Sequence, residues 1–236
     1  MNSRLPLIVA NLKANKTWDE VSSWIDDVAA DAQNFKGTIV FCPSYPFLAA
    51  AHQKISQNGI NLKLGAQDVS RFEQGAYTGE VAAAQIADLC QFAIIGHSER
   101  RKYFGEDDDQ VIEKVKLSIA SKITPILCIS DLKQLDVYSE KGTIIIDNAL
   151  QIIFVYEPPN AISGGGEFRP DSPDDANEQA GKIKEKIGQT ITTIYGGSIN
   201  NENAKGFFTK ENLMGGLVGQ ASLDPQKFTG IIKSLN

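Results

Sequence analysis

Residues 92–101 read Phe-Ala-Ile-Ile-Gly-His-Ser-Glu-Arg-Arg, and this stretch decides how the chain folds. Four apolar residues are followed by a glycine and then by a run of polar and charged residues. A segment that is apolar on consecutive positions is typical of a parallel strand covered on both faces. The stretch therefore predicts a buried strand over residues 92–95 with chemically reactive groups directly at its carboxyl end.

The same arrangement recurs along the chain. The spacing of these runs is near that of a strand–helix–strand unit, ~30 residues. Each run is short, apolar and rich in β-branched residues, so each predicts a further strand. The seven other predicted strands cover residues 7–10, 38–42, 62–66, 125–129, 152–156, 193–195 and 216–218.

The segments between these runs have helical periodicity. Residues 17–32 place apolar side chains at i, i+3 and i+4, and Thr17 with Glu20 forms a capping-box pattern at the start. Residues 106–121 repeat the periodicity after an acidic start. A Ser-Pro pair precedes the helix predicted over 174–187, and an Asp-Pro pair precedes the one over 226–235.

Eight strand–helix units favour one closed parallel (β/α)8 TIM barrel, a single domain spanning residues 1–236. The alternative, an open doubly wound sheet that binds a dinucleotide, would carry Gly-x-Gly-x-x-Gly after its first strand, and none is present. One unit departs from the scheme. Residues 131–151 leave little room for a crossover helix, and residues 143–146 read as a strand, so we expect a shortened or irregular fifth helical unit.

The composition excludes several classes of protein. The chain is 42% hydrophobic and 22% charged with a formal net charge of −6, which argues against disorder and against nucleic acid as a main partner. Cys42, Cys90 and Cys128 are isolated and there are only two histidines, so neither a disulfide framework nor a metal site is expected. With no signal peptide pattern and no long apolar run, we expect a soluble cytoplasmic protein without a membrane partner.

Candidate functional residues gather just past the predicted strand ends, where the active sites of parallel barrels lie. Asn11 and Lys13 follow the first strand, and His97 begins a helix after the fourth. Glu157 follows the sixth strand. A carboxylate can act as general base, a neutral histidine at a helix start can donate to a carbonyl oxygen, and a lysine can stabilise an oxyanion.

Two further strand ends carry glycines. Gly196 and Gly197 precede Ser198 after the seventh strand, and Gly219 precedes Gln220 after the eighth. Backbone N–H groups in such loops can approach a phosphate closely. Taken with the polar side chains, these loops predict proton abstraction beside a carbonyl in a small phosphorylated substrate.

Simpler interpretations exist for each residue alone. A strand-end Glu or Lys is usually a solvated loop charge, and a glycine pair is usually a turn. His52, within an alanine-rich segment, is interpreted as a helix surface residue. The functional interpretation of Asn11, Lys13, His97 and Glu157 depends on their falling on one rim together with two phosphate-type loops.

With these residues assembled, the chain resembles the triosephosphate isomerase family nearly end to end. The most specific match is Ile-Ile-Gly-His-Ser-Glu-Arg-Arg at residues 94–101. Others are Asn-Leu-Lys-Ala-Asn at 11–15, Gly-Ala-Gln-Asp at 65–68 with Gly-Ala-Tyr-Thr-Gly-Glu at 75–80, Tyr-Glu-Pro at 156–158 and Tyr-Gly-Gly-Ser at 195–198.

The resemblance implies interconversion of dihydroxyacetone phosphate and D-glyceraldehyde 3-phosphate, in glycolysis or gluconeogenesis, without metal or cofactor. It implies Glu157 as base, His97 as proton shuttle and Lys13 as oxyanion stabiliser, with Glu99 pairing with Lys13 or supporting it. It further implies that Asn11 orients the substrate. The implied phosphate-binding groups are the backbone N–H groups of Ser163, Ser198, Gly219 and Gln220.

The resemblance also implies a homodimer. The loop over residues 68–80 would reach into a partner, with Thr78 supporting the partner's Asn and Lys. The chain departs from the family at residues 159–166, which read Pro-Asn-Ala-Ile-Ser-Gly-Gly-Gly, and at Gln220, where the family has glycine. Because three successive glycines enlarge the ensemble that closure must order, we expect this sixth loop to close less completely.

Two alternatives to a working isomerase stay open at this point. One is a catalytically reduced phosphate-binding barrel that acts as a binding or interaction protein. The other is a phosphate-binding barrel enzyme of biosynthesis, which would share the glycine loops but would not explain residues 94–101.

Overall fold

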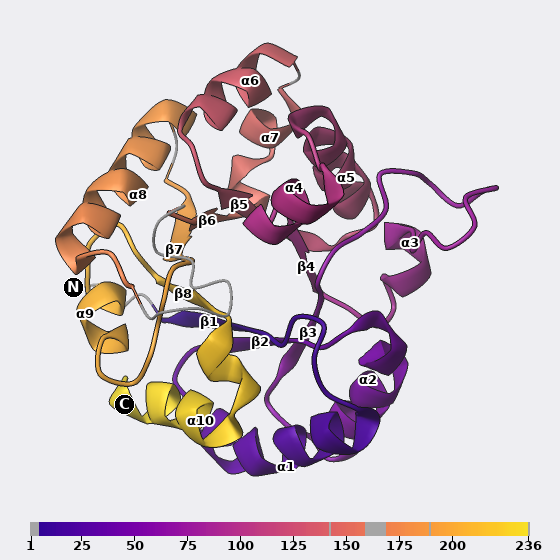
Figure 1. Cartoon of the computed structure of the whole chain (residues 1–236), viewed down its shortest axis with the longest axis vertical. Coiled ribbons are helices and arrows are strands. Elements are labelled where there is room, and N and C mark those ends of the chain that lie inside the picture. The colour runs from indigo at the N-terminus through magenta and orange to yellow at the C-terminus, as the bar shows by residue number, and fades with distance from the viewer. Residues whose placement is uncertain (1–4, 142, 159–168, 189, 236) are drawn as a thin grey trace.

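Eight parallel strands close into a barrel in the computed structural model, which describes residues 5–141, 143–158, 169–188 and 190–235. Neighbouring strands follow chain order, and β1 also pairs with β8 to close the ring. The helices surround the strands (Figure 1). The predicted (β/α)8 barrel is thereby confirmed, and the open sheet is excluded. The strands are β1 (Leu7–Asn11), β2 (Thr38–Cys42), β3 (Lys63–Ala66), β4 (Phe92–Ile95), β5 (Thr124–Ile129), β6 (Ile153–Tyr156), β7 (Thr192–Tyr195) and β8 (Gly215–Val218).

The helices begin where the capping signals predicted. Thr17 caps α1 with the expected capping box, Ser172 caps α8, and Asp224 caps α10. The regular helices are α1 (Trp18–Asn34), α2 (Leu48–Gln57), α3 (Ala83–Ile86), α4 (Ser98–Phe104), α5 (Asp108–Ala120), α6 (Lys133–Lys141), α7 (Ile144–Asp147), α8 (Pro173–Ile187), α9 (Ala204–Phe208) and α10 (Pro225–Ser234). Three 3-10 turns, η1 (Tyr45–Phe47), η2 (Ala149–Gln151) and η3 (Gln220–Leu223), complete the description.

One helix starts later than predicted. The periodicity indicated a helix from Glu106, but α5 begins at Asp108 and Asp107 is its cap. Glu106 is 5% exposed and its carboxylate is bonded to Arg100 and Lys114 instead. A side chain used in tertiary contacts of this kind takes no part in starting a helix.

The fifth unit is irregular, as expected, but the strand-like reading of residues 143–146 was wrong. This unit consists of α6, the single turn α7 and η2. The N–H of Asp147 donates to the carbonyl of Thr143 at 2.7 Å, a helical bond, and Ile145 is fully buried. Three isoleucines in a row favour a strand, but packing of a buried side chain overrides that preference.

The core has two layers because successive strand residues point to opposite faces. Val9, Cys42 and Cys128 belong to the cluster that fills the barrel, while Ile8 and Ala10 pack outward against the helices. All three cysteines are buried and unpaired. The prediction that they pack in the core is confirmed.

Gly215 makes the closure between β8 and β1 possible. It pairs with Leu7 and has φ +158°. A Cβ at this position would lie 1.7 Å from the carbonyl oxygen of Leu7, which no side chain could tolerate.

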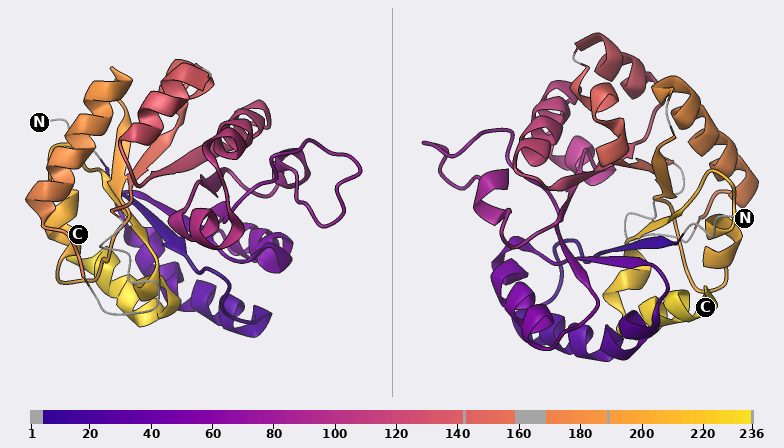
Figure 2. Two further views of the ribbon diagram at one scale, coloured as in Figure 1. Left: turned by 45° about the horizontal axis from the view of Figure 1, so that its top comes forward. Right: turned by 180° about the vertical axis from the view of Figure 1, so that it is seen from behind.

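The segment between β3 and α3 projects beyond the ring of helices (Figure 2). Phe72 stacks on Tyr77 within it, with ring centroids 4.1 Å apart. None of the helices in the described part of the chain combines the length and the apolarity needed to cross a membrane.

Candidate active site

The end of β1 carries a lysine in an unusual backbone conformation. Lys13 has φ +52°, which is uncommon for a residue other than glycine. Its N–H donates to Asn11 Oδ1 at 3.0 Å. Its carbonyl accepts from Ser44 Oγ at 3.0 Å and from Gln67 Nε2 at 2.9 Å. These three bonds hold the strained peptide and fix the direction in which the lysine side chain leaves the backbone.

His97 sits between the end of β4 and the start of α4. Its Nδ1 accepts the N–H of Glu99 at 3.2 Å, so the ring caps the helix. A nitrogen that accepts carries no proton, and this bond therefore selects the neutral ring with its proton on Nε2. That Nε2 lies 3.3 Å from Oε1 of Glu157.

Glu157 follows β6 and is almost completely buried, with 1% of its surface exposed. Its backbone N–H donates to the carbonyl of Ile129, which fixes it to the neighbouring strand β5. Its carboxylate accepts the Ser98 N–H on Oε2 at 2.9 Å and the Ser98 Oγ–H on Oε1 at 2.7 Å. Burial raises the pKa of the Cys128 thiol, and the negative charge of the nearby Glu157 raises it further. A neutral thiol therefore lies beside the carboxylate.

A salt bridge joins the two loops that carry these groups. Lys13 Nζ donates to Glu99 Oε1 at 2.6 Å. The predicted pairing of Lys13 with Glu99 is thus confirmed. Since Glu99 also bonds the ring of His97, one continuous path of contacts runs from Lys13 through Glu99 and His97 to Glu157.

The ends of β7 and β8 lie beside each other because these strands are paired. Gly219 lies against Lys13, and a Cβ on it would be 3.2 Å from the lysine Cε. Gln220 is exposed and opens η3. Ser198 is half-buried, and its carbonyl accepts from Asn203 Nδ2 at 3.0 Å. Gly219 and Lys13 are therefore brought together, whereas Ser163 and the rest of the sixth loop lie outside the described residues.

Ser222 links the two ends of the site. Its Oγ lies 3.0 Å from the carbonyl oxygen of Asn11 and 2.7 Å from that of Gly219. Asn11 itself is 5% exposed. The loop after β8 is thereby held against the end of β1.

Several contributors were not predicted from the sequence. Ser98 stands beside His97 in the motif, and its position was the one available signal for its contact with Glu157. Ser44, Gln67 and Ser222 are distant in sequence from the groups they hold, so no local pattern indicates them.

Two other residues named from the sequence lie elsewhere. Thr78 is exposed on the projecting segment between β3 and α3. His52 lies on α2 and is half-buried, with Nδ1 3.1 Å from the carbonyl oxygen of Leu89. Within the described ranges, no three His, Cys, Asp or Glu side chains are grouped so that they could hold a metal ion.

Comparison with known proteins agrees with this geometry. The family model described as triosephosphate isomerase matches residues 6–235. A protein of Endomicrobium trichonymphae named triosephosphate isomerase is 34% identical over 248 residues, covering 98% of each chain. Proteins of the same name from Shewanella loihica and Thermus thermophilus are each 33% identical. The first alignment covers 98% of this chain and 97% of the relative, and the second covers 98% of both.

Proposed function

The chain belongs to the triosephosphate isomerase family, and from that premise we propose how its own residues carry the reaction. The enzyme interconverts dihydroxyacetone phosphate and D-glyceraldehyde 3-phosphate. The observation that carries the assignment of roles is the continuous path from Lys13 through Glu99 and His97 to Glu157.

Glu157 is the base. Its carboxylate takes a proton from the carbon beside the substrate carbonyl, and the electrons of that C–H bond form the C=C bond of a cis-enediolate. The carbonyl oxygen receives the negative charge. Return of the proton to the neighbouring carbon completes the isomerisation. Burial at 1% exposure supports this role, because a closed position keeps bulk water away from the proton being transferred.

His97 and Lys13 stabilise the oxygen charge. The N–H of Glu99 holds the neutral ring of His97 in place by its bond to Nδ1. The Nε2–H of this ring can then donate to the enediolate oxygens, and His97 can move a proton between them. The ammonium of Lys13 supplies a fixed positive charge, and Asn11 orients the substrate. Glu99 supports Lys13 through its 2.6 Å bond.

The substrate phosphate would be held by backbone N–H groups of Ser198, Gly219 and Gln220, with Ser163 contributing from the sixth loop. The contact between Gly219 and Lys13 supports this arrangement, because it puts a cation beside the proposed anion site. The alternative of a catalytically reduced binding barrel has no observation in its favour.

A coupled assay of glyceraldehyde 3-phosphate conversion tests the proposal. The Glu157→Asp variant withdraws the carboxylate by one methylene, and we expect kcat to fall by about 10²- to 10³-fold. Glu178→Asp, an exposed residue on α8, is the matched control and should behave as wild type. Turnover by Glu157→Asp close to wild type would contradict the assignment of the base.

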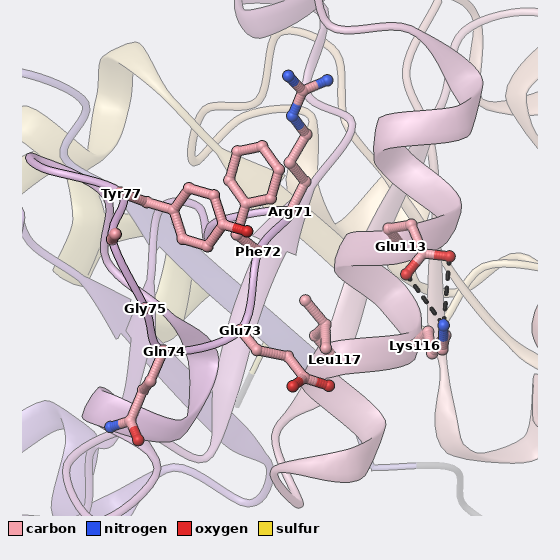
Figure 3. A pocket seen from close by; sticks show the side chains of 10 residues that line it. Arg71, Phe72, Glu73, Gln74, Gly75, Tyr77, Glu113, Lys116 and Leu117 are labelled. Carbon is pink, nitrogen blue, oxygen red and sulfur yellow. Dashed lines mark hydrogen bonds and ion pairs between the residues drawn. The ribbon is translucent and has the colours of Figure 1, made fainter.

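We also propose that the chain forms a homodimer through the segment between β3 and α3. Tyr77 is 45% exposed and stacks on the half-buried Phe72, so an aromatic pair stands on a segment that projects beyond the ring of helices, where a second chain would cover it. A hollow of about 440 Å³ lies between this segment and α5 (Figure 3). Thr78 would then reach the partner's active site.

Sedimentation equilibrium measures this assembly directly. The expected mass is twice the 25.7 kDa of one chain, and Tyr77→Glu should shift the protein toward the monomer. Leu150→Glu, at another strongly exposed apolar residue, is the control. A wild-type protein that sediments as a monomer would contradict the dimer.

A cytoplasmic location is proposed as well. It is supported by the three buried cysteines, which form no disulfide, because a reducing compartment keeps thiols free.

A further inference from the structure

Four charged side chains meet at the base of the segment between β3 and α3. Lys114 Nζ lies 2.7 and 2.9 Å from the two oxygens of Asp68 and 2.7 Å from Glu106 Oε2. Arg100 Nε lies 2.8 Å from Asp68 Oδ2 and 2.7 Å from Glu106 Oε2. Two cations are thus shared by two carboxylates. Asp68, Glu106 and Lys114 are each less than 9% exposed, so this charge balance is kept largely away from water.

This cluster reaches the peptide immediately before His97. The second oxygen of Glu106, Oε1, accepts the N–H of Gly96 at 3.1 Å. Gly96 has φ +71°, a left-handed conformation, and its carbonyl is held from the other side by Arg101 Nε at 3.1 Å. Any displacement of Glu106 therefore acts on the backbone that places the imidazole of His97.

We propose that Asp68 is a positioning residue for the isomerase reaction: it anchors Lys114 and Arg100 so that Glu106 stays on the Gly96 N–H. His97 then keeps its place opposite Glu157. The inference rests on the proposed role of His97. Without the Asp68 carboxylate, Lys114 and the half-buried Arg100 would both turn to the single carboxylate of Glu106, which already contacts each of them. Glu106 would turn toward the cations and weaken its bond to Gly96.

The ionisation of Asp68 gives this link a dependence on pH. The groups that face it are Lys114 on α5, Arg100 on α4, Glu106 between these helices, and Tyr45 of η1, whose hydroxyl donates to the Asp68 carbonyl. Burial raises the pKa of Asp68 to about 6 against the opposing effect of the two cations. As pH falls through this value, the carboxylate takes up a proton and loses its ion pairs with Lys114 and Arg100.

The Asp68→Asn variant tests the proposal because it keeps the shape of the side chain and removes its charge. We expect kcat to fall about tenfold and KM to change by less than about twofold, since the phosphate loops are elsewhere. The ratio of wild-type to variant kcat should approach one below pH about 6. Asp26→Asn, which removes a surface partner of Lys54, is the matched control.

A spectroscopic readout separates positioning from loss of folding. The chain has only two histidines, so a histidine-labelled sample gives ring ¹⁵N signals for His97 with His52 as internal reference. In Asp68→Asn the His97 signals should move while those of His52 stay. A folded variant with wild-type kcat and unchanged His97 signals would overturn the proposal.

A second variant tests the proposal if Asp68→Asn is unstable. Asp68→Asn with Lys114→Met removes one charge of each sign and leaves Arg100 on Glu106, so it should regain part of the lost kcat or fold where the single variant does not. A double variant no better than the single one contradicts the proposal. A wild-type chain without isomerase turnover contradicts the proposed function instead, and the His97 signals still decide the positioning role.

Discussion

The two halves of the barrel rim are built in different ways. The half formed by the ends of β1, β4 and β6 consists of charged and polar residues linked by contacts of 2.6 to 3.3 Å, which run from Lys13 through Glu99 and His97 to Glu157. The half formed by the ends of β7 and β8 presents glycines and backbone groups, with Gly219 as its contact to Lys13. We infer that the first half governs the chemical step and the second governs substrate binding.

The largest effect expected from this comparison is at Lys13, where the two halves touch. Lys13→Met removes the charge that stabilises both the oxyanion and the proposed phosphate site, so kcat/KM should fall about 10³-fold or more. Steady-state kinetics measures it. Lys16→Met is a matched control, because Lys16 also has a positive φ, +73°. A Lys13→Met enzyme with more than about a tenth of wild-type kcat/KM would contradict the inference that Lys13 serves both the chemical step and substrate binding.

A smaller effect is expected at Gly219. In Gly219→Ala the new methyl would lie 3.2 Å from Lys13 Cε, and the flexible end of that side chain can move by a few tenths of an ångström. We expect KM to rise about three- to tenfold with kcat within about threefold of wild type. Gly206→Ala, whose Cβ would lie 3.3 Å from Pro173, is the control. A fall in kcat at unchanged KM would show that the halves are not separable.

The smallest effect concerns the free energy of unfolding, and it is expected at Asp68, in the buried charge cluster that supports the first half. Burial raises the pKa of Asp68 from 3.8 to about 6, so the folded state binds this proton more tightly than the unfolded state does. The contribution of Asp68 to stability therefore increases as pH falls through about 6 toward 3.8.

Urea unfolding of wild type and Asp68→Asn at two pH values measures this contribution. Between pH about 8 and about 5 the wild type should gain about 1 kcal/mol relative to the variant, because titrating groups outside the Asp68 cluster cancel in the difference. A difference that stays constant over this range would contradict the prediction that burying the charge of Asp68 lowers the stability of the fold.

Most of the fold follows from local patterns. Consecutive apolar residues placed all eight strands to within one residue at either end, and the caps at Thr17 and Ser172 placed the starts of α1 and α8. These signals are local because a strand covered on both faces, or a helix cap, is a property of a few adjacent residues. The run of isoleucines at 144–146 misled because its conformation depends on what Ile145 packs against.

The site was predictable to the extent that its residues stand at strand ends. The positions of Asn11, Lys13, His97, Glu99 and Glu157 follow from that rule, whereas the residues that orient them do not. Gln67 is 54 positions from the carbonyl it holds, and Lys114 is 46 positions from Asp68. Such contacts are created by the closure of the barrel, and no spacing in the sequence encodes them.

The pairing of Leu7 with Gly215 has a consequence for how the protein is made. At a synthesis rate of about 5–20 residues per second, the ribosome needs about 10–40 s after adding Leu7 before it adds the residue that closes the ring. During that interval one edge of β1 has no native neighbour, and an unpaired edge invites association with other chains. The first strand is therefore the segment of the newborn chain that most needs protection, and crowded polysomes are where misassembly of this barrel should begin.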